Sequence, residues 1–136
     1  MEKGFREVPH IADVALEVWG KDLPELFVHA AQGLSSLAVT VETGAAISAE
    51  RQVHLTAPDW ETLLVDWLNE LLLLQAEHDE AYITFDVVLP AVGELSARVG
   101  GTRDFTVQRT IKAATFHDLV IQETPEGYRA VVVLDV

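Results

Sequence analysis

The stretch from Pro58 to Leu74 carries the strongest helical pattern in this chain. Large apolar side chains recur there at spacings of three and four residues, which brings them onto one face of an α-helix. They are Trp60, Leu63, Leu64, Trp67, Leu68, Leu71 and Leu72. Val65, Leu73 and Leu74 widen the apolar surface well beyond one face, which indicates a helix buried near the centre of a domain. The predicted exposed face carries Asp59, Asp66, Asn69 and Glu70.

A second helix is predicted from Leu23 to about Ala38. Asp22 is suited to the N-cap and Pro24 to the first turn, and apolar residues then recur at helical spacing. His29 lies off the apolar stripe and is expected at the surface. The helix must pack against a sheet, because most helical stability in proteins comes from the packing of an apolar face.

Strands are predicted in most of the remaining chain, from β-type residues that alternate between apolar and polar. They cover about residues 12–20, 51–57, 82–89, 93–99, 105–117, 119–123 and 128–134. Pro125-Glu126-Gly127 predicts the turn of an antiparallel hairpin between the last two. The order of elements predicts an α+β fold, in which residues 1–136 form a single compact domain with a mostly antiparallel sheet packed by two amphipathic helices. The simplest arrangement places both helices on one sheet.

The composition limits the classes of function. A chain of 136 residues suits one domain, and 49% hydrophobic residues allow it a full core. The net charge of −13, from 22 acidic and 9 basic residues, argues against direct binding of nucleic acid, because phosphate binding needs a dense basic surface. The acidic excess favours hard divalent cations or a basic protein partner, although it also serves solubility alone.

Cysteine is absent, which excludes disulfides, thiolate catalysis and cysteine zinc sites. Met1 to Phe5 contains no apolar signal segment, and no apolar run is long enough to cross a membrane. We therefore expect a cytoplasmic protein that does not bind membranes.

Gly100-Gly101 lacks the spacing of a nucleotide-binding loop, and the polar cluster from Glu77 to Glu80 is interpreted as a solvated loop.

Carboxylates stand near both ends of the chain. Asp13 follows His10 at the start of the first predicted strand, and Asp135 and Val136 end the last one. If these strands are neighbours, the two aspartates and the carboxylate of Val136 converge, and their repulsion favours a proton or a cation. Oxygen ligands select Mg²⁺, Ca²⁺ or Mn²⁺ over zinc. The sequence does not show that the strands are neighbours, so Asp135 as an exposed terminal residue and Asp13 as a turn residue remain alternatives.

Four segments resemble the successive motifs of the archease family, in the same order and over nearly the whole chain. They are His10-Ile11-Ala12-Asp13-Val14, Leu64 to Leu72, Ile111 to His117, and Val133-Leu134-Asp135-Val136. The resemblance implies a small accessory protein that is not itself an enzyme. It implies activation of an RtcB-type RNA ligase in tRNA splicing and RNA repair, through promotion of the ligase's guanylylation and its multiple turnover.

The same resemblance implies a metal bound by Asp13, Asp135 and the carboxylate of Val136, with Ca²⁺, Mg²⁺ or Mn²⁺ as the ion. His10, Lys112 and His117 are possible supporting residues. Lys112 and His117 are expected on one strand at an odd separation, so they should face opposite sides unless a bulge intervenes.

The chain departs from the family pattern at several places. Ile11 stands where threonine is typical, Phe116 where tyrosine is typical, and Gly100-Gly101 with Gln108-Arg109 where a Gly-Glu pair and a histidine are typical. Whether the stretch from Gly100 to Arg109 still supports activation of a ligase is therefore an open question at the level of sequence.

Two other functions are compatible with the sequence. One is a chaperone-like module for a tRNA-modifying enzyme such as a cytosine methyltransferase, whose effect on its partner would survive loss of the metal site. The other is a metal-dependent hydrolase that acts alone, which would turn over a phosphoester without a partner.

Overall fold

A computed structural model describes residues 3–8 and 13–136. Within this part of the chain, the helices are α1 (Leu23–Ala38) and α2 (Trp60–His78). The strands are β1 (Phe5–Val8), β2 (Val14–Gly20), β3 (Val39–Val41), β4 (Ala49–Thr56), β5 (Ala81–Val88), β6 (Glu94–Thr102), β7 (Phe105–Val107), β8 (Ala113–Ala114), β9 (Gln122–Thr124) and β10 (Gly127–Asp135).

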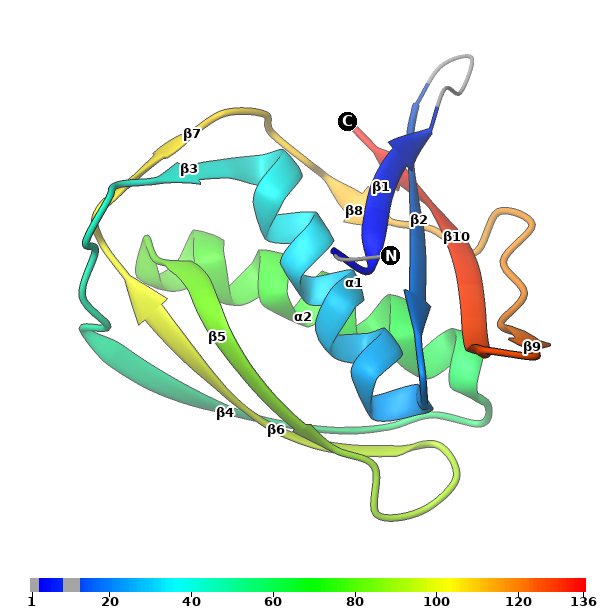
Figure 1. The fold of residues 1–136 in the computed structure, drawn as a ribbon. Coiled ribbons are helices and arrows are strands. Elements are labelled where there is room, and N and C mark those ends of the chain that lie inside the picture. The colour runs from blue at the N-terminus through cyan, green and yellow to red at the C-terminus, as the bar shows by residue number, and fades with distance from the viewer. Residues whose placement is uncertain (1–2, 9–12) are drawn as a thin grey trace.

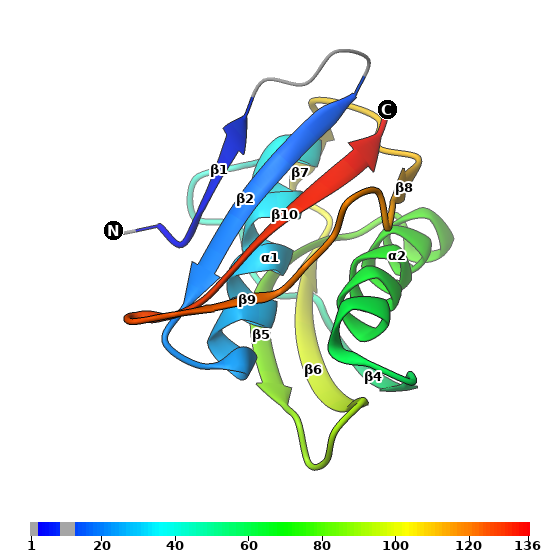
Figure 2. The same ribbon diagram turned by 90° about the vertical axis from the view of Figure 1, so that its right-hand side faces the viewer.

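The two helices lie between two separate sheets (Figures 1 and 2). The larger sheet has the order β1-β2-β10-β8, and β9 pairs with the start of β10. The smaller has the order β4-β6-β5, and β3 pairs with β7 beside the end of α1. Every ladder is antiparallel among the described strands. Since α1 contacts both β2 and β5, it connects the two sheets through the core.

Both helices begin at an aspartate that caps the first turn. The side chain of Asp22 accepts a hydrogen bond from the Glu25 N–H at 2.9 Å, and that of Asp59 accepts one from the Thr62 N–H at 2.7 Å. Each cap satisfies one backbone donor that the helix leaves unpaired. Helix α2 ends at His78, and its C-cap residue, Asp79, adopts a left-handed conformation with φ of 53°.

The core lies where the helices meet the inner faces of the sheets. The Trp67 indole N–H donates to the Phe27 carbonyl at 3.0 Å, so a hydrogen bond inside the core joins the helices. The large side chains that are almost completely buried come from both helices and both sheets: Trp67, Phe27, Leu16, Leu26, Leu63, Leu64, Leu68, Leu95, Leu134, Val18 and Val65. Neither α1 nor α2 combines the length and apolar character needed to span a membrane.

The predicted α+β fold is confirmed, as are both helices and the hairpin before β10. The expectation of both helices on one sheet is wrong, because the strands divide into sheets on opposite sides of the helices. The prediction of a single strand over residues 105–117 is also wrong. Strand β7 ends at Val107 and β8 begins only at Ala113, and between them the N–H groups of Gln108 and Arg109 both donate to the Ala38 carbonyl, at 2.8 and 3.1 Å.

His29 is half-buried, which corrects its expected surface position. Its Nδ1 lies 2.6 Å from the Trp19 carbonyl oxygen, so the ring connects α1 to the end of β2. The short strands β1 and β3 have no counterpart in the prediction.

Candidate functional site

The first and last long strands of the larger sheet lie side by side. Val14 of β2 is the register partner of Leu134 in β10, and both are buried. Asp13 directly precedes β2, and Asp135 is the last residue of β10, so both adjoin this last register pair. The structure therefore brings these two aspartates to the same end of the sheet, where β10 also ends (Figure 2).

The two carboxylates differ in their surroundings. Leu134 is completely buried, so the alternation of side chains along β10 directs Asp135 to the opposite face of the sheet, where it is exposed. Asp13 is half-buried. Val136, the residue after Asp135, is 40% exposed. This end of the sheet is thus open to solvent and accessible to an ion or a partner.

Lys112 lies beside the end of β10. Its backbone N–H donates to the Asp135 carbonyl at 2.8 Å, and Ala113 is the register partner of Asp135. The Lys112 side chain is exposed. Lys112 and the two aspartates are therefore gathered at one end of the sheet by strand pairing.

His117 lies in a turn after β8 and is exposed. Its Nε2 is 3.3 Å from Oδ2 of Asp118. Because β8 ends at Ala114, His117 and Lys112 do not share a strand, and the expectation that they face opposite sides of one strand is wrong. His10 lies outside the described residues.

The donor chemistry of this end of the sheet suits a hard divalent cation. Asp13 and Asp135 offer carboxylate oxygens. Oxygen donors of this type are the ligands of Mg²⁺, Ca²⁺ and Mn²⁺. Within residues 3–8 and 13–136, no three His, Cys, Asp or Glu side chains are grouped to hold a metal.

A buried carboxylate joins three strands of the same sheet. Glu17 of β2 is only 5% exposed and is bound by Arg6 of β1 and Arg129 of β10. Burial raises the pKa of Glu17, but the hydrogen bonds and positive charges of Arg129 and Arg6 outweigh it and hold the pKa below its ordinary value. Glu17 therefore remains ionised and holds β1 and β10 to β2.

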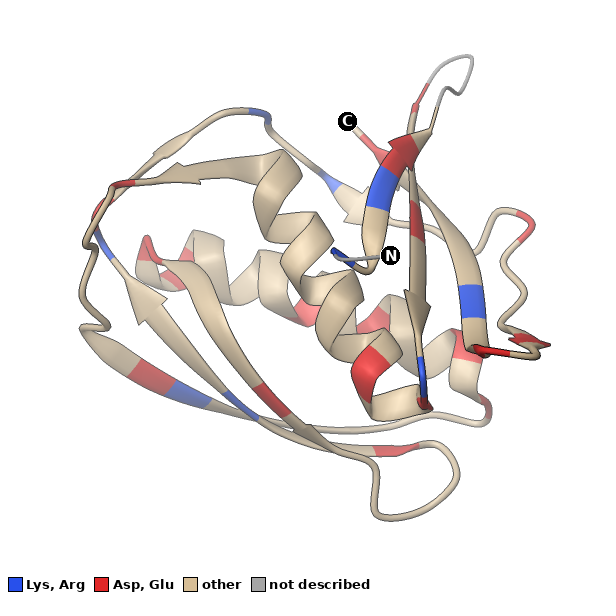
Figure 3. Ribbon diagram, in the orientation of Figure 1, with Lys and Arg blue, Asp and Glu red and all other residues tan. Residues whose placement is uncertain are grey.

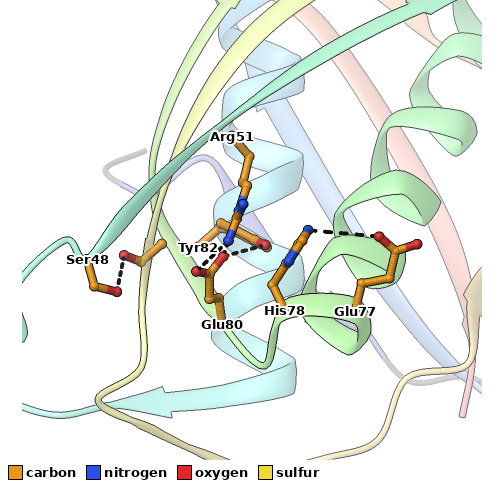
Figure 4. A network of polar contacts seen from close by, with 7 residues as sticks. Ser48, Arg51, Glu77, His78, Glu80 and Tyr82 are labelled. Atoms are coloured by element: carbon orange, nitrogen blue, oxygen red, sulfur yellow. Dashed lines mark hydrogen bonds and ion pairs between the residues drawn. The ribbon is translucent and has the colours of Figure 1, made fainter.

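A second buried carboxylate, that of Glu80, lies directly before β5 of the smaller sheet (Figure 4). Glu80 is 1% exposed, so its interpretation as part of a solvated loop is wrong. Arg51 donates to it from Nε and Nη2, at 3.1 and 3.0 Å, and the Tyr82 hydroxyl lies 3.1 Å away. The Arg51 hydrogen bonds lower the pKa of Glu80 against the effect of burial, while burial, with Glu80 beside it, raises the pKa of the Tyr82 hydroxyl.

The pair Gly100-Gly101 lies in β6 behind this cluster. A Cβ atom on Gly101 would lie 3.0 Å from the Tyr82 ring and 3.2 Å from Oε1 of Glu80, and one on Gly100 would lie 2.2 Å from Oγ1 of Thr84. The two glycines thus make room for neighbouring side chains. They have a packing role at this position.

Asn69 of α2 was expected on an exposed face, and this is wrong. It is half-buried, and both polar atoms of its amide group bind the backbone of Ala114 in β8. The one signal in the sequence is that this is the only asparagine of the chain and that it lies in the middle of a leucine-rich helix.

Acidic residues are spread over both helices, both sheets and several loops, while the few basic residues are scattered singly among them (Figure 3). Figure 3 shows no concentration of basic residues in the described part of the chain. Over residues 3–8 and 13–136, the charge distribution therefore offers a nucleic-acid backbone no continuous basic surface.

Comparisons with known proteins agree over almost the whole chain. A family model described as "Archease protein family (MTH1598/TM1083)" matches residues 5–136. A protein archease of Methanosarcina acetivorans is 34% identical over 144 residues, which cover 98% of this chain and 97% of that protein. A protein archease of Archaeoglobus fulgidus is 35% identical over 138 residues, with coverage of 97% and 98%.

Two solved structures share the fold. The solution structure of Methanobacterium thermoautotrophicum protein 1598 matches with a TM-score of 0.74 and 26% identity, covering 98% of this chain and 99% of that one. The crystal structure from Thermotoga maritima, described as an archease and possible chaperone, matches with a TM-score of 0.68 and 22% identity, covering 96% of each chain.

Proposed function

Because the chain belongs to the archease family, we propose that it is an accessory protein that activates an RtcB-type RNA ligase in tRNA splicing and RNA repair. In this role the chain does no chemistry alone. It promotes guanylylation of the ligase and allows the ligase to turn over repeatedly. The observation that supports the proposal is the pairing of Val14 with Leu134, because Asp13 and Asp135 directly adjoin this pair at an exposed sheet end.

The proposed site consists of Asp13, Asp135 and the carboxylate of Val136, with Ca²⁺, Mg²⁺ or Mn²⁺ as its ion. A bound divalent cation would neutralise charge on phosphate oxygens during nucleotidyl transfer. The carboxylates of this chain would hold the cation at an open end of the sheet, where a partner can approach it. His10, Lys112 and His117 are proposed as supporting residues.

The proposed partner surface is a basic one. The chain has 22 acidic and 9 basic residues, and this excess of negative charge favours association with a positively charged protein surface. The same excess opposes direct contact with RNA. RNA would therefore be bound by the ligase, while the accessory chain contacts the ligase.

The test is a guanylylation assay of an RtcB-type ligase with and without this chain, at varied Mg²⁺ and Mn²⁺. The wild-type chain should increase the rate of guanylylation and allow multiple turnovers. Asp13→Ala and deletion of Val136 should abolish this effect while circular dichroism shows an unchanged fold. Asp86→Asn is the matched control, since Asp86 is exposed on β5 in the other sheet. Full stimulation by both site variants would refute the proposal.

A chaperone-like action is the second candidate, supported by the description of the Thermotoga maritima protein as a possible chaperone. It would increase the solubility of a tRNA-modifying enzyme such as a cytosine methyltransferase. This effect should persist in the Asp13→Ala variant. Measurement of soluble enzyme with wild-type and variant chains therefore separates the two functions.

A further inference from the structure

Strand β8 lies at the edge of the larger sheet, beside the end of β10. The Lys112 N–H donates to the Asp135 carbonyl at 2.8 Å, and the Thr115 N–H donates to the Val133 carbonyl at 2.9 Å. The Thr115 hydroxyl donates to the same Val133 carbonyl, also at 2.9 Å. These bonds hold residues 112–115 along the last residues of β10.

The backbone N–H and C=O of Ala114 point away from β10. The bond from Thr115 to Val133 flanks the pair Ala114 and Leu134, a pattern in which the polar groups of the paired residues point away from each other. The N–H and C=O of Ala114 therefore point to the outer edge of the sheet, where no further strand is paired in the described part of the chain. Ala114 is only 5% exposed, and buried backbone groups require partners.

Asn69 supplies both partners from α2. Its Oδ1 accepts from the Ala114 N–H at 2.8 Å, and its Nδ2 donates to the Ala114 carbonyl at 3.2 Å. An amide side chain carries a donor and an acceptor, so it can bond as the peptide group of a neighbouring strand would. Aspartate, glutamate or an apolar residue cannot supply both groups.

The helix that carries Asn69 is firmly placed. Trp67 and Leu68, just before Asn69, are completely buried, and Leu71 just after it is 4% exposed. The amide group is therefore anchored to the core. Residues 112–115 are held on one side by β10 and on the other by α2.

We infer that Asn69 is a positioning residue for the carboxylate end of the sheet. By fixing Ala114, it keeps the backbone of Lys112 and Ala113 against Asp135, and so limits the motion of the last two residues of the chain. This inference rests on the proposed cation site at Asp13, Asp135 and Val136. Loss of the amide group would leave every proposed ligand residue in the chain, but the ligands would be held in a less defined orientation.

The test compares Asn69→Leu, which has a similar volume and no hydrogen-bonding group, with Asn69→Asp, which keeps an acceptor for the Ala114 N–H. Calcium and manganese affinities are measured by isothermal titration calorimetry. Asn69→Leu should bind one cation about ten-fold more weakly than wild type, as is usual when a group that orients metal ligands is removed. The cation affinity of Asn69→Asp should lie between those of wild type and Asn69→Leu. Amide hydrogen exchange should be faster at Lys112 and Thr115 in Asn69→Leu.

Ser35→Ala controls for general destabilisation. The Ser35 hydroxyl donates to the Tyr82 carbonyl at 3.0 Å, so it too is a helix side chain bound to a strand backbone, but in the other sheet. Its removal should leave cation affinity unchanged. If Asn69→Leu binds the cation as tightly as wild type, or if Ser35→Ala weakens cation binding equally, the role of Asn69 is refuted but the metal site is not. A wild-type chain that binds no cation would overturn the metal site as well.

Discussion

Val14 and Leu134 are cross-strand partners, although they lie near opposite ends of the sequence. This pairing brings Asp13, which precedes Val14, and Asp135 and Val136, which follow Leu134, to the same end of the sheet. A shift of one residue in the register would turn the apolar residues of β10 away from the core, so the burial of Leu134 fixes the register between β2 and β10.

Cation binding should stabilise the folded chain. A ligand that binds only the folded state at about 100 times its Kd adds about 2.7 kcal/mol. Thermal unfolding in Ca²⁺ should therefore occur at a higher temperature than in EDTA. Asp13→Asn should remove this difference, and so should a short extension after Val136, because it removes the carboxylate of that residue. Asp86→Asn should keep it, and an undiminished effect of Ca²⁺ in the Asp13→Asn variant would contradict the site.

Glu17 should make stability depend on acid pH. Arg129 and Arg6 hold the pKa of folded Glu17 below its ordinary value, although burial alone would raise it. The unfolded state therefore binds more protons, and the contribution of Glu17 is complete above about pH 4.5 and lost as the pH falls through the folded pKa.

Urea unfolding between pH 7 and pH 3 checks this dependence. The free energy of unfolding should fall more steeply with acid in wild type than in Glu17→Gln. Glu123→Gln, on exposed β9, should follow wild type. Parallel curves for wild type and Glu17→Gln would rule out the lowered pKa.

Removal of Arg51 should destabilise the fold strongly. The change Arg51→Met leaves the Glu80 carboxylate buried without its bidentate partner, and breaking a buried pair in this way costs about 3–5 kcal/mol. The double variant Arg51→Met/Glu80→Gln should recover part of that loss, since no buried charge remains. Urea unfolding of the three proteins gives the comparison, and a double variant less stable than Arg51→Met would contradict the explanation.

The change Trp67→Phe should lower the free energy of unfolding by about 2–3 kcal/mol. It leaves the buried Phe27 carbonyl without its donor and removes part of a completely buried ring. Trp60 is only half-buried and contacts the Phe27 ring edge-on, so Trp60→Phe should have a smaller effect. Equal effects of the two changes in chemical denaturation would show that the hydrogen bond contributes little.

Gly33→Ala should be destabilising, although alanine is favoured over glycine in a helix by about 1 kcal/mol. The new Cβ would lie 2.8 Å from Cδ2 of buried Leu16 and 2.9 Å from Cγ of Phe5. Overpacking of this kind costs about 1–3 kcal/mol. Gln32→Ala, at an exposed position of the same helix, should change stability little. A more stable Gly33→Ala protein would mean that the sheet can move away from α1.

Local features of the sequence were sufficient for the helices and for most strands. Apolar spacing and the capping residues Asp22 and Asp59 act within one or two turns, so the sequence alone determines both helices. Strands β1 and β3 are too short to establish an alternating pattern. The break after β7 could not be predicted, because the partner of Gln108 and Arg109 is the distant carbonyl of Ala38.

The candidate site divides in the same way. The sequence by itself determined which residues carry carboxylates, that oxygen ligands would favour a hard cation, and that Asp13 and Asp135 flank strands. Tertiary structure alone decided that these strands are neighbours, that Glu80 is buried, and that Asn69 binds the backbone of β8. The physical reason is that strand register, burial and side-chain hydrogen bonds depend on contacts between distant segments, which the local residue pattern does not specify.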